Sequence, residues 1–130
     1  MRRLVVDAMN VIGSRPDGWW RDREGAIRRF VTRLEAYAEH HDGPVTVVID
    51  GRPVDEVPEG RRGALDVRYA ARRGRNAADD RIVALLDEWD EPATVVTADR
   101  DLRDRVAALG ASTTGPRDLL DALDRLTEQA

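Results

Sequence analysis

The chain has 130 residues, of which 35% are charged and 42% hydrophobic, and its formal net charge is −4. This length and balance predict one domain, residues 1–130, with a buried core and a heavily charged surface. There is no cysteine and no lysine, which excludes disulfides, cysteine nucleophiles and every site that depends on a lysine.

Short β-branched runs alternate with longer helical stretches, a pattern typical of a parallel sheet covered by helices. In the first part of the chain we expect a strand over residues 3–7, a loop over 10–23, a helix over 24–41, a strand over 45–50 and a loop over 51–63.

The second part continues the same alternation. We expect a strand over residues 65–70, an arginine-rich turn over 71–75, a helix from Asn76 to Trp89, a strand over 93–98, a helix that begins at Asp99 and is closed by Gly110, an edge strand over 111–113 and a helix over 116–127. The predicted fold class is α/β, a three-layer α/β/α domain with a mainly parallel sheet.

The first residues run directly into the first expected strand and do not form the apolar region of a signal peptide. No apolar stretch is long enough to span a membrane. We therefore expect a cytoplasmic protein that has no membrane partner.

Aspartates stand where the apolar runs stop. Asp7, Asp50 and Asp99 each follow a strand pattern, and Asp79 and Asp80 open the helix that comes after another strand. Ligands of open α/β sheets bind outside the carboxyl ends of the strands, so these acids should meet at one edge. Crowded carboxylates repel one another and favour a hard divalent cation, Mg²⁺ or Mn²⁺. The pattern predicts metal-dependent phosphoryl chemistry.

Each acid also has a structural explanation. Asp7 could cap a turn, and Asn10, one turn later, could hold the loop or bind a phosphate or water. Acids in a first helical turn are stabilised by about a few tenths of a kcal/mol in any case, which explains one carboxylate better than two. Asp79 falls on the side of apolar Ile82 and should point toward the sheet edge, whereas Asp80 should face solvent and play a supporting role.

A basic segment precedes these helical acids. From Arg61 to Arg75 the chain carries six arginines against the single acid Asp66. A solvated face explains such a run, and so does binding to a phosphate backbone, for which the candidates are Arg72, Arg73 and Arg75, with Arg52 at the end of an earlier strand. Trp19 and Trp20 are either core anchors or a stacking platform for unpaired bases.

The motifs Asp7-x-x-Asn10, Asp50-Gly51, Ala78-Asp79-Asp80 and Thr97-Ala98-Asp99-Arg100-Asp101, in this order and spacing, resemble the NYN domains of the PIN-like nuclease superfamily, in particular their YacP-like branch. The resemblance covers essentially the whole chain and implies a Rossmann-like sheet of order 3-2-1-4-5. It further implies endoribonuclease activity on RNA at a pocket that binds Mg²⁺ or Mn²⁺. By motif match, Asp7, Asp79 and Asp99 take the metal-ligand places, and Asn10 and Asp50 complete the pocket.

Other functions remain to be weighed against a metal-dependent ribonuclease. A catalytically silent RNA-binding module of the same fold, associated with a ribosomal or RNA-processing partner, has no need for unpaired carboxylates. A phosphatase of this topology places a second aspartate two residues after the first, where this chain has Met9, and a receiver domain requires a lysine. Dinucleotide binding requires a glycine-rich turn after the first strand, which this chain lacks.

Overall fold

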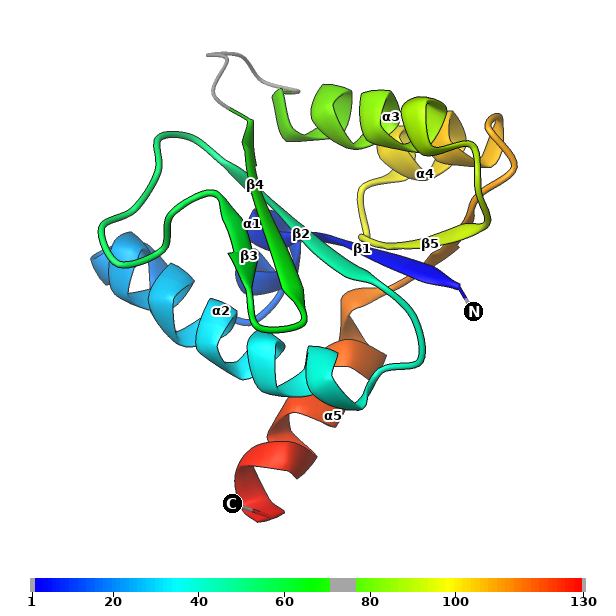
Figure 1. Ribbon diagram of the computed structural model, residues 1–130. Helices are drawn as coiled ribbons and strands as arrows, with labels where there is room; N and C mark the ends of the chain where they lie inside the picture. The colour runs from blue at the N-terminus through cyan, green and yellow to red at the C-terminus, as the bar shows by residue number, and fades with distance from the viewer. Residues whose placement is uncertain (1, 71–76, 130) are drawn as a thin grey trace.

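The computed structural model describes residues 2–70 and 77–129. Over these ranges it contains one sheet between two layers of helices (Figure 1). The strands are β1 (Arg3–Asp7), β2 (Val45–Asp50), β3 (Gly60–Arg62), β4 (Leu65–Ala70), β5 (Ala93–Val96) and β6 (Ser112–Thr114). The helices are α1 (Ala8–Gly13), the 3-10 helix η1 (Trp19–Asp22), α2 (Arg23–His40), α3 (Ala77–Trp89), α4 (Arg100–Ala107) and α5 (Pro116–Gln129).

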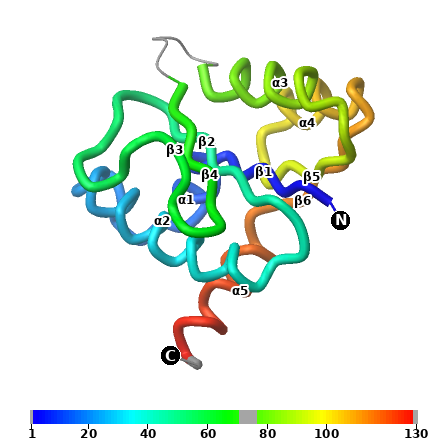
Figure 2. The backbone as a smooth tube through the Cα atoms, in the orientation of Figure 1, coloured from blue at the N-terminus to red at the C-terminus, as the bar shows by residue number. Residues whose placement is uncertain are grey.

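The strand order is β3-β4-β2-β1-β5-β6 (Figure 2). All neighbouring strands are parallel except β3, which pairs antiparallel with β4. The five expected strands therefore stand in the expected order, 3-2-1-4-5, and the three-layer prediction is confirmed. One strand, β3, is added at the edge.

The prediction of a loop over residues 51–63 is wrong at its end, because β3 lies there. Hydrogen bonds to Tyr69 of β4 explain why the segment before β3 has a defined structure. The Tyr69 hydroxyl donates to the Val57 carbonyl at 2.6 Å and accepts from the Val54 amide at 3.2 Å. The Tyr69 amide donates to the Glu59 carboxylate at 2.9 Å. These partners are distant in sequence, so local composition could not reveal them.

The prediction of a loop over residues 10–23 is also wrong, because α1 and η1 lie in this region. Val11 and Ile12 are buried in the core, and the Ser14 hydroxyl closes α1 by donating to the Val11 carbonyl at 2.6 Å. Of the residues that suggested a loop, Gly13 is the last residue of this short helix, and Pro16 and Gly18 follow it. The expected cap at Asn76 lies outside the described residues.

Alternation along the strands divides the core into two halves. Leu4 and Val6 belong to the half under α1, α2 and α5, whereas Val5 belongs to the half under α3 and α4. In the same way Val48 of β2 and Val95 of β5 face α3 and α4. This register decides on which side of the sheet the strand-end side chains lie. No helix among residues 2–70 and 77–129 is long and apolar enough to cross a membrane.

Candidate functional site

Three strand-end side chains share the face of the sheet that α3 and α4 cover. Asp7 comes two residues after Val5, Asp50 two after Val48, and Thr97 two after Val95, so each repeats the direction of a residue in that half of the core. Helix α3 adds Asp79 from its first turn, and Asp99 stands immediately before α4. The four aspartates singled out in the sequence are thereby brought to one edge.

Asp7 is the most buried of these acids, with 5% of its surface exposed. Its pKa is raised from 3.8 to about 6: burial raises it most, a hydrogen bond from the Thr97 hydroxyl lowers it, and the charges of Asp79, Asp99 and Asp50 add to the rise. The Thr97 hydroxyl lies 2.9 Å from Asp7 Oδ2. The negative charges of three other aspartates thus raise the pKa of Asp7, and the Thr97 hydroxyl orients its carboxylate.

The two acids in the first turn of α3 differ as their helical positions predict. Asp79 is buried, and burial, followed by the charge of Asp99, raises its pKa to about 6, whereas Arg105 lowers it. Asp80 is exposed and accepts a hydrogen bond from Arg105 Nη1 at 2.9 Å. Arg105, on α4, was missed by sequence reasoning because only the packing of α4 beside α3 brings it to these acids.

The turn between β5 and α4 is held by side chains. Asn10 Oδ1 accepts a hydrogen bond from the Ala98 amide at 2.7 Å, and Thr97 Oγ1 accepts one from the Asp99 amide at 3.1 Å. Asp99 Oδ1 in turn accepts from the Leu102 amide at 3.2 Å and caps α4. The Thr97 amide still donates to the Thr114 carbonyl of β6 at 2.9 Å, but the Ala98 and Asp99 amides bond to side chains, and β5 ends at Val96 and not at Ala98 as expected.

Thr97 is the second residue that sequence reasoning missed. Its hydroxyl donates to Asp7 and accepts from the Asp99 amide, so it links two of the predicted ligands. Its place two residues after buried Val95 and two before Asp99 is the signal that could have identified it.

Asp50 ends β2 with its side chain half-buried, and Arg23 approaches its backbone. Arg23 Nη2 donates to the Asp50 carbonyl at 2.5 Å. Gly51 has φ +102, and a Cβ there would lie 3.3 Å from Arg23 Nη2, so this close approach favours glycine. Arg52 follows on the exposed surface.

The family profile of the YacP-like NYN domain matches residues 4–130. The chain belongs to the YacP-like NYN domain family. Its resemblance in sequence to this branch is thereby confirmed, and the fold is of the nuclease type found in that family.

Two crystal structures resemble this NYN domain, both of Rae1 (YacP) from Bacillus subtilis and one of them a point mutant. They superpose with a TM-score of 0.76 at 23% and 22% identity. The matches cover 99% of this chain and 79% and 77% of those chains. At this low sequence identity, the structural similarity shows that the chain shares the fold of these proteins. No curated protein sequence matched the chain.

The adjacent tryptophans Trp19 and Trp20 of the NYN domain differ in exposure. Trp19 is half-buried and packs against the core, whereas Trp20 is 57% exposed. Their rings meet edge to face with centroids 6.2 Å apart, and the Arg21 guanidinium lies 5.9 Å from the centre of the Trp20 ring. Trp19 thus contributes to the core with part of its ring, and Trp20 is exposed; that either ring stacks on a base stays a prediction.

The basic segment is less positive than its sequence suggests. Arg62 pairs with Glu35 of α2 at 2.9 Å, and Arg68 pairs with Asp66 at 3.1 Å. Glu35 is remote in sequence, so counting charges along the segment overlooked it. Arg72, Arg73 and Arg75 lie outside the described residues.

The acidic edge has the donor chemistry of a site for a hard divalent cation, because it presents carboxylate oxygens, and the pKa values of two of these carboxyl groups, Asp7 and Asp79, are raised by burial and by neighbouring carboxylates. In the described ranges, no three acidic or histidine side chains stand close enough to hold a metal ion as they are placed. Binding would therefore require the carboxylates to close in around the ion. The residues available for it are Asp7, Asp79 and Asp99, with Asp80 beside them.

Proposed function

We propose that the protein is a Mg²⁺- or Mn²⁺-dependent endoribonuclease that hydrolyses RNA phosphodiester bonds at the carboxyl edge of the sheet. The proposal rests on the surroundings of Asp7, a buried carboxylate whose pKa is raised chiefly by burial and additionally by the nearby charges of Asp79, Asp99 and Asp50. A shared cation would explain why three carboxylates from separate parts of the chain lie near enough to Asp7 to influence it electrostatically. The nuclease-type fold of the family supports the same proposal.

The proposed roles divide among the residues of this edge. Asp7, Asp79 and Asp99 would hold the cation with Asp80 in support, and Asn10 and Asp50 would complete the catalytic group. A divalent cation bound there would polarise the scissile phosphate and lower the pKa of a water molecule. Thr97 orients Asp7 through its hydrogen bond, and Arg105 holds the carboxylate of Asp80.

The first test is cleavage of a short single-stranded RNA by the purified chain. With Mg²⁺ or Mn²⁺ we expect internal cuts, and with EDTA we expect none, because the proposed chemistry depends on the cation. Cleavage that continues at the same rate in EDTA would contradict metal dependence. Binding without cleavage under every cation would favour a silent RNA-binding module instead, and adding ribosomal or RNA-processing fractions would then test whether a partner is required.

We also propose that Arg52, Arg72, Arg73 and Arg75 contact the RNA backbone and that Trp19 and Trp20 supply stacking. Replacing Arg72, Arg73 and Arg75 with Ala should weaken RNA binding and lower the log–log salt slope by about 0.7 for each lost contact with a single strand. Binding is measured over a salt series with Ca²⁺ in place of Mg²⁺ to suppress cleavage.

A control with the same change of net charge replaces Arg28, Arg117 and Arg125, which lie on α2 and α5. Its salt slope should remain close to that of the unchanged protein. Equal slopes for both triple variants would assign the RNA path to another surface, beginning with exposed Trp20.

A further inference from the structure

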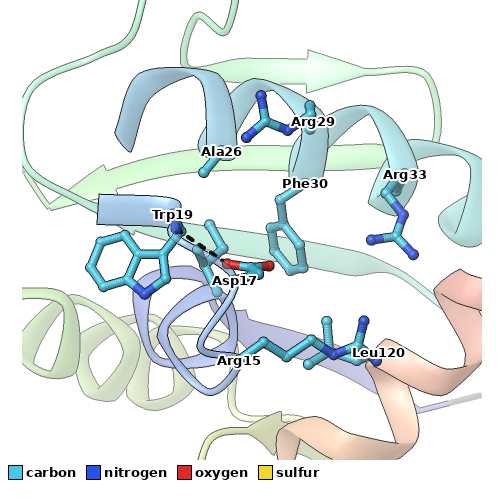
Figure 3. Close-up of a pocket in the computed structure, with 9 residues that line it drawn as sticks. Arg15, Asp17, Trp19, Ala26, Arg29, Phe30, Arg33 and Leu120 are labelled. Carbon is cyan, nitrogen blue, oxygen red and sulfur yellow. Dashed lines mark hydrogen bonds between the residues drawn. The ribbon is translucent and has the colours of Figure 1, made fainter. Parts of the chain in front are cut away.

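A cavity of about 280 Å³ lies on the other side of the sheet from the acidic edge, between α1, α2 and α5 (Figure 3). Its apolar wall includes Phe30, which belongs to the half of the core under these helices, and the indole of Trp19. Its polar wall contains the guanidinium groups of Arg15, Arg29 and Arg33 against the single carboxylate of Asp17. Neither the acidic edge nor the proposed cleavage uses these arginines.

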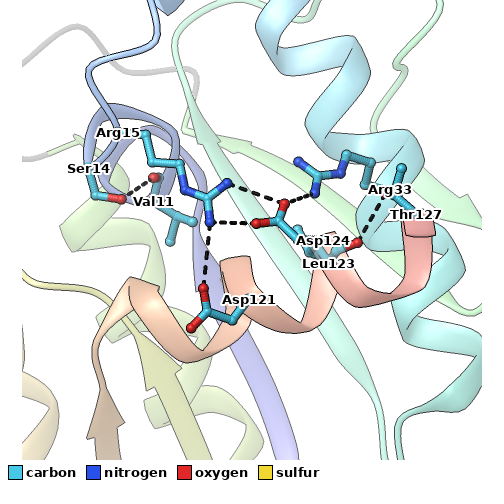
Figure 4. Close-up of polar contacts among 8 residues, drawn as sticks. All are labelled: Val11, Ser14, Arg15, Arg33, Asp121, Leu123, Asp124 and Thr127. Carbon is cyan, nitrogen blue, oxygen red and sulfur yellow. Dashed lines mark hydrogen bonds and ion pairs between the residues drawn. The ribbon is translucent and has the colours of Figure 1, made fainter. Parts of the chain in front are cut away.

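Acidic side chains of α5 fix the orientation of two of the three arginines, Arg15 and Arg33 (Figure 4). Asp124 accepts hydrogen bonds from Arg15 Nη2 at 2.9 Å and from Arg33 Nη2 at 2.5 Å, and Asp121 lies 3.8 Å from Arg15. The hydrogen bonds from Arg15 and Arg33 lower the pKa of Asp124 to about 2. This carboxylate therefore stays charged at neutral pH and holds two guanidinium groups together, which would otherwise repel each other.

Two of the arginines that line the cavity have unused hydrogen-bond donors. Arg33 Nε is buried, and no acceptor for it exists among the described residues. Across the same part of the chain, the Arg29 side chain makes no hydrogen bond and no ion pair. The nearby acids are otherwise engaged: Asp17 Oδ1 accepts from the Trp19 amide at 3.2 Å, and Asp22 Oδ1 accepts from the Gly25 amide at 3.1 Å. A buried donor without an acceptor is unfavourable, and an anion bound to these arginines would satisfy it if the Arg33 side chain turned to present its Nε–H.

The chemistry of the walls indicates the kind of ligand. Planar guanidinium groups match phosphate oxygens, and aromatic rings match a base or sugar face. Pockets for drug-sized ligands run from about 300 to 1,000 Å³, so a cavity of 280 Å³ suits a single small unit. We propose that this cavity binds one nucleotide, with its phosphate on Arg29 and Arg33 and its base or sugar beside Trp19. The nucleotide is either free or part of an RNA strand.

The test follows side-chain NMR signals, namely the Arg33 Nε–H and the Trp19 indole N–H, during titration with AMP and with inorganic phosphate. No divalent cation is present, so nothing is cleaved. Both signals should shift saturably with AMP, and AMP should bind more tightly than phosphate. Arg29→Ala should weaken AMP binding about tenfold, the scale of losing one charge-assisted hydrogen bond. Arg29 is exposed, and the amide spectrum of the variant shows whether it is folded.

Arg125→Ala is the matched control, because it removes the same charge from an exposed helical position outside the cavity, and it should bind AMP as the unchanged protein does. Short single-stranded RNA that displaces AMP would assign the cavity to a nucleotide of an RNA strand, and AMP binding that RNA leaves intact would assign it to a free nucleotide. Any one of three results would overturn the proposal. These are the absence of a saturable shift in the signals, binding of AMP by Arg29→Ala as tightly as by the unchanged protein, and binding of AMP no more tightly than phosphate. Each result is independent of whether the acidic edge cleaves RNA.

Discussion

Replacing Asp7 with Asn should abolish the divalent-dependent cleavage of RNA while the chain remains folded. Asn keeps the size of the side chain and can still accept the hydrogen bond from Thr97, so the change removes chiefly the charge. The loss of one preorganised electrostatic group costs about 10²–10³-fold in rate, and a metal ligand should cost at least that much. The measurement is the single-turnover rate on a short labelled RNA with saturating Mg²⁺ or Mn²⁺.

Variants of the other acids test whether Asp7 acts alone. Asp79→Asn should lose a comparable amount of activity, and so should Asp99→Asn, in which the amide oxygen can still cap α4. Asp42→Asn is the control, because Asp42 is exposed in the turn before β2, at the opposite end of that strand from Asp50. Cleavage by Asp7→Asn at the rate of the unchanged protein would show that the catalytic assignment is wrong.

The acidic edge could be anticipated because it follows from the direction of the strands. Parallel strands end on the same side, so an aspartate after each strand reaches that edge whatever the details of packing. The alternation of β-branched residues places Asp7 and Asp50 on one face, and helical spacing separates buried Asp79 from exposed Asp80. These are regularities of short range, which the amino-acid sequence carries directly.

The features that escaped prediction depend on contacts between distant residues. Strand β3 forms because Tyr69 holds the segment before it, and the pairing of Glu35 with Arg62 joins α2 to that strand. The arginine cavity is the extreme case, since Asp124 lies 91 positions after Arg33 in the sequence. No local pattern identifies such a pair, because only the docking of α5 beside α2 creates it.

Stability should depend on pH through the same carboxylate that we expect to be catalytic. The pKa of Asp7 is raised from 3.8 to about 6 in the folded protein, so between these values the folded state binds more protons than the unfolded state. The free energy of unfolding should therefore fall as the pH rises from about 4 to about 6, and level off above about pH 7. A shift of roughly two units corresponds to about 3 kcal/mol for this buried group. Asp79, whose pKa is also raised to about 6, acts in the same direction.

Denaturant unfolding of the unchanged protein and of Asp7→Asn, compared from pH 4.5 to pH 8 without divalent cations, measures this contribution. Asp124 does not interfere, because its lowered pKa makes a stabilising contribution that is lost only as the pH falls below 3.8 toward about 2. Asp7→Asn should be more stable than the unchanged protein by up to about 3 kcal/mol at pH 8, with a difference that shrinks toward pH 4.5, because an amide carries no charge to desolvate.

Adding Mg²⁺ should then stabilise the unchanged protein more than the variant, since a ligand raises stability only where it binds the folded state. A gain of the same size at both ends of the pH range would mean that the charge of Asp7 is not what destabilises this edge, and it would remove the electrostatic reason for a cation there.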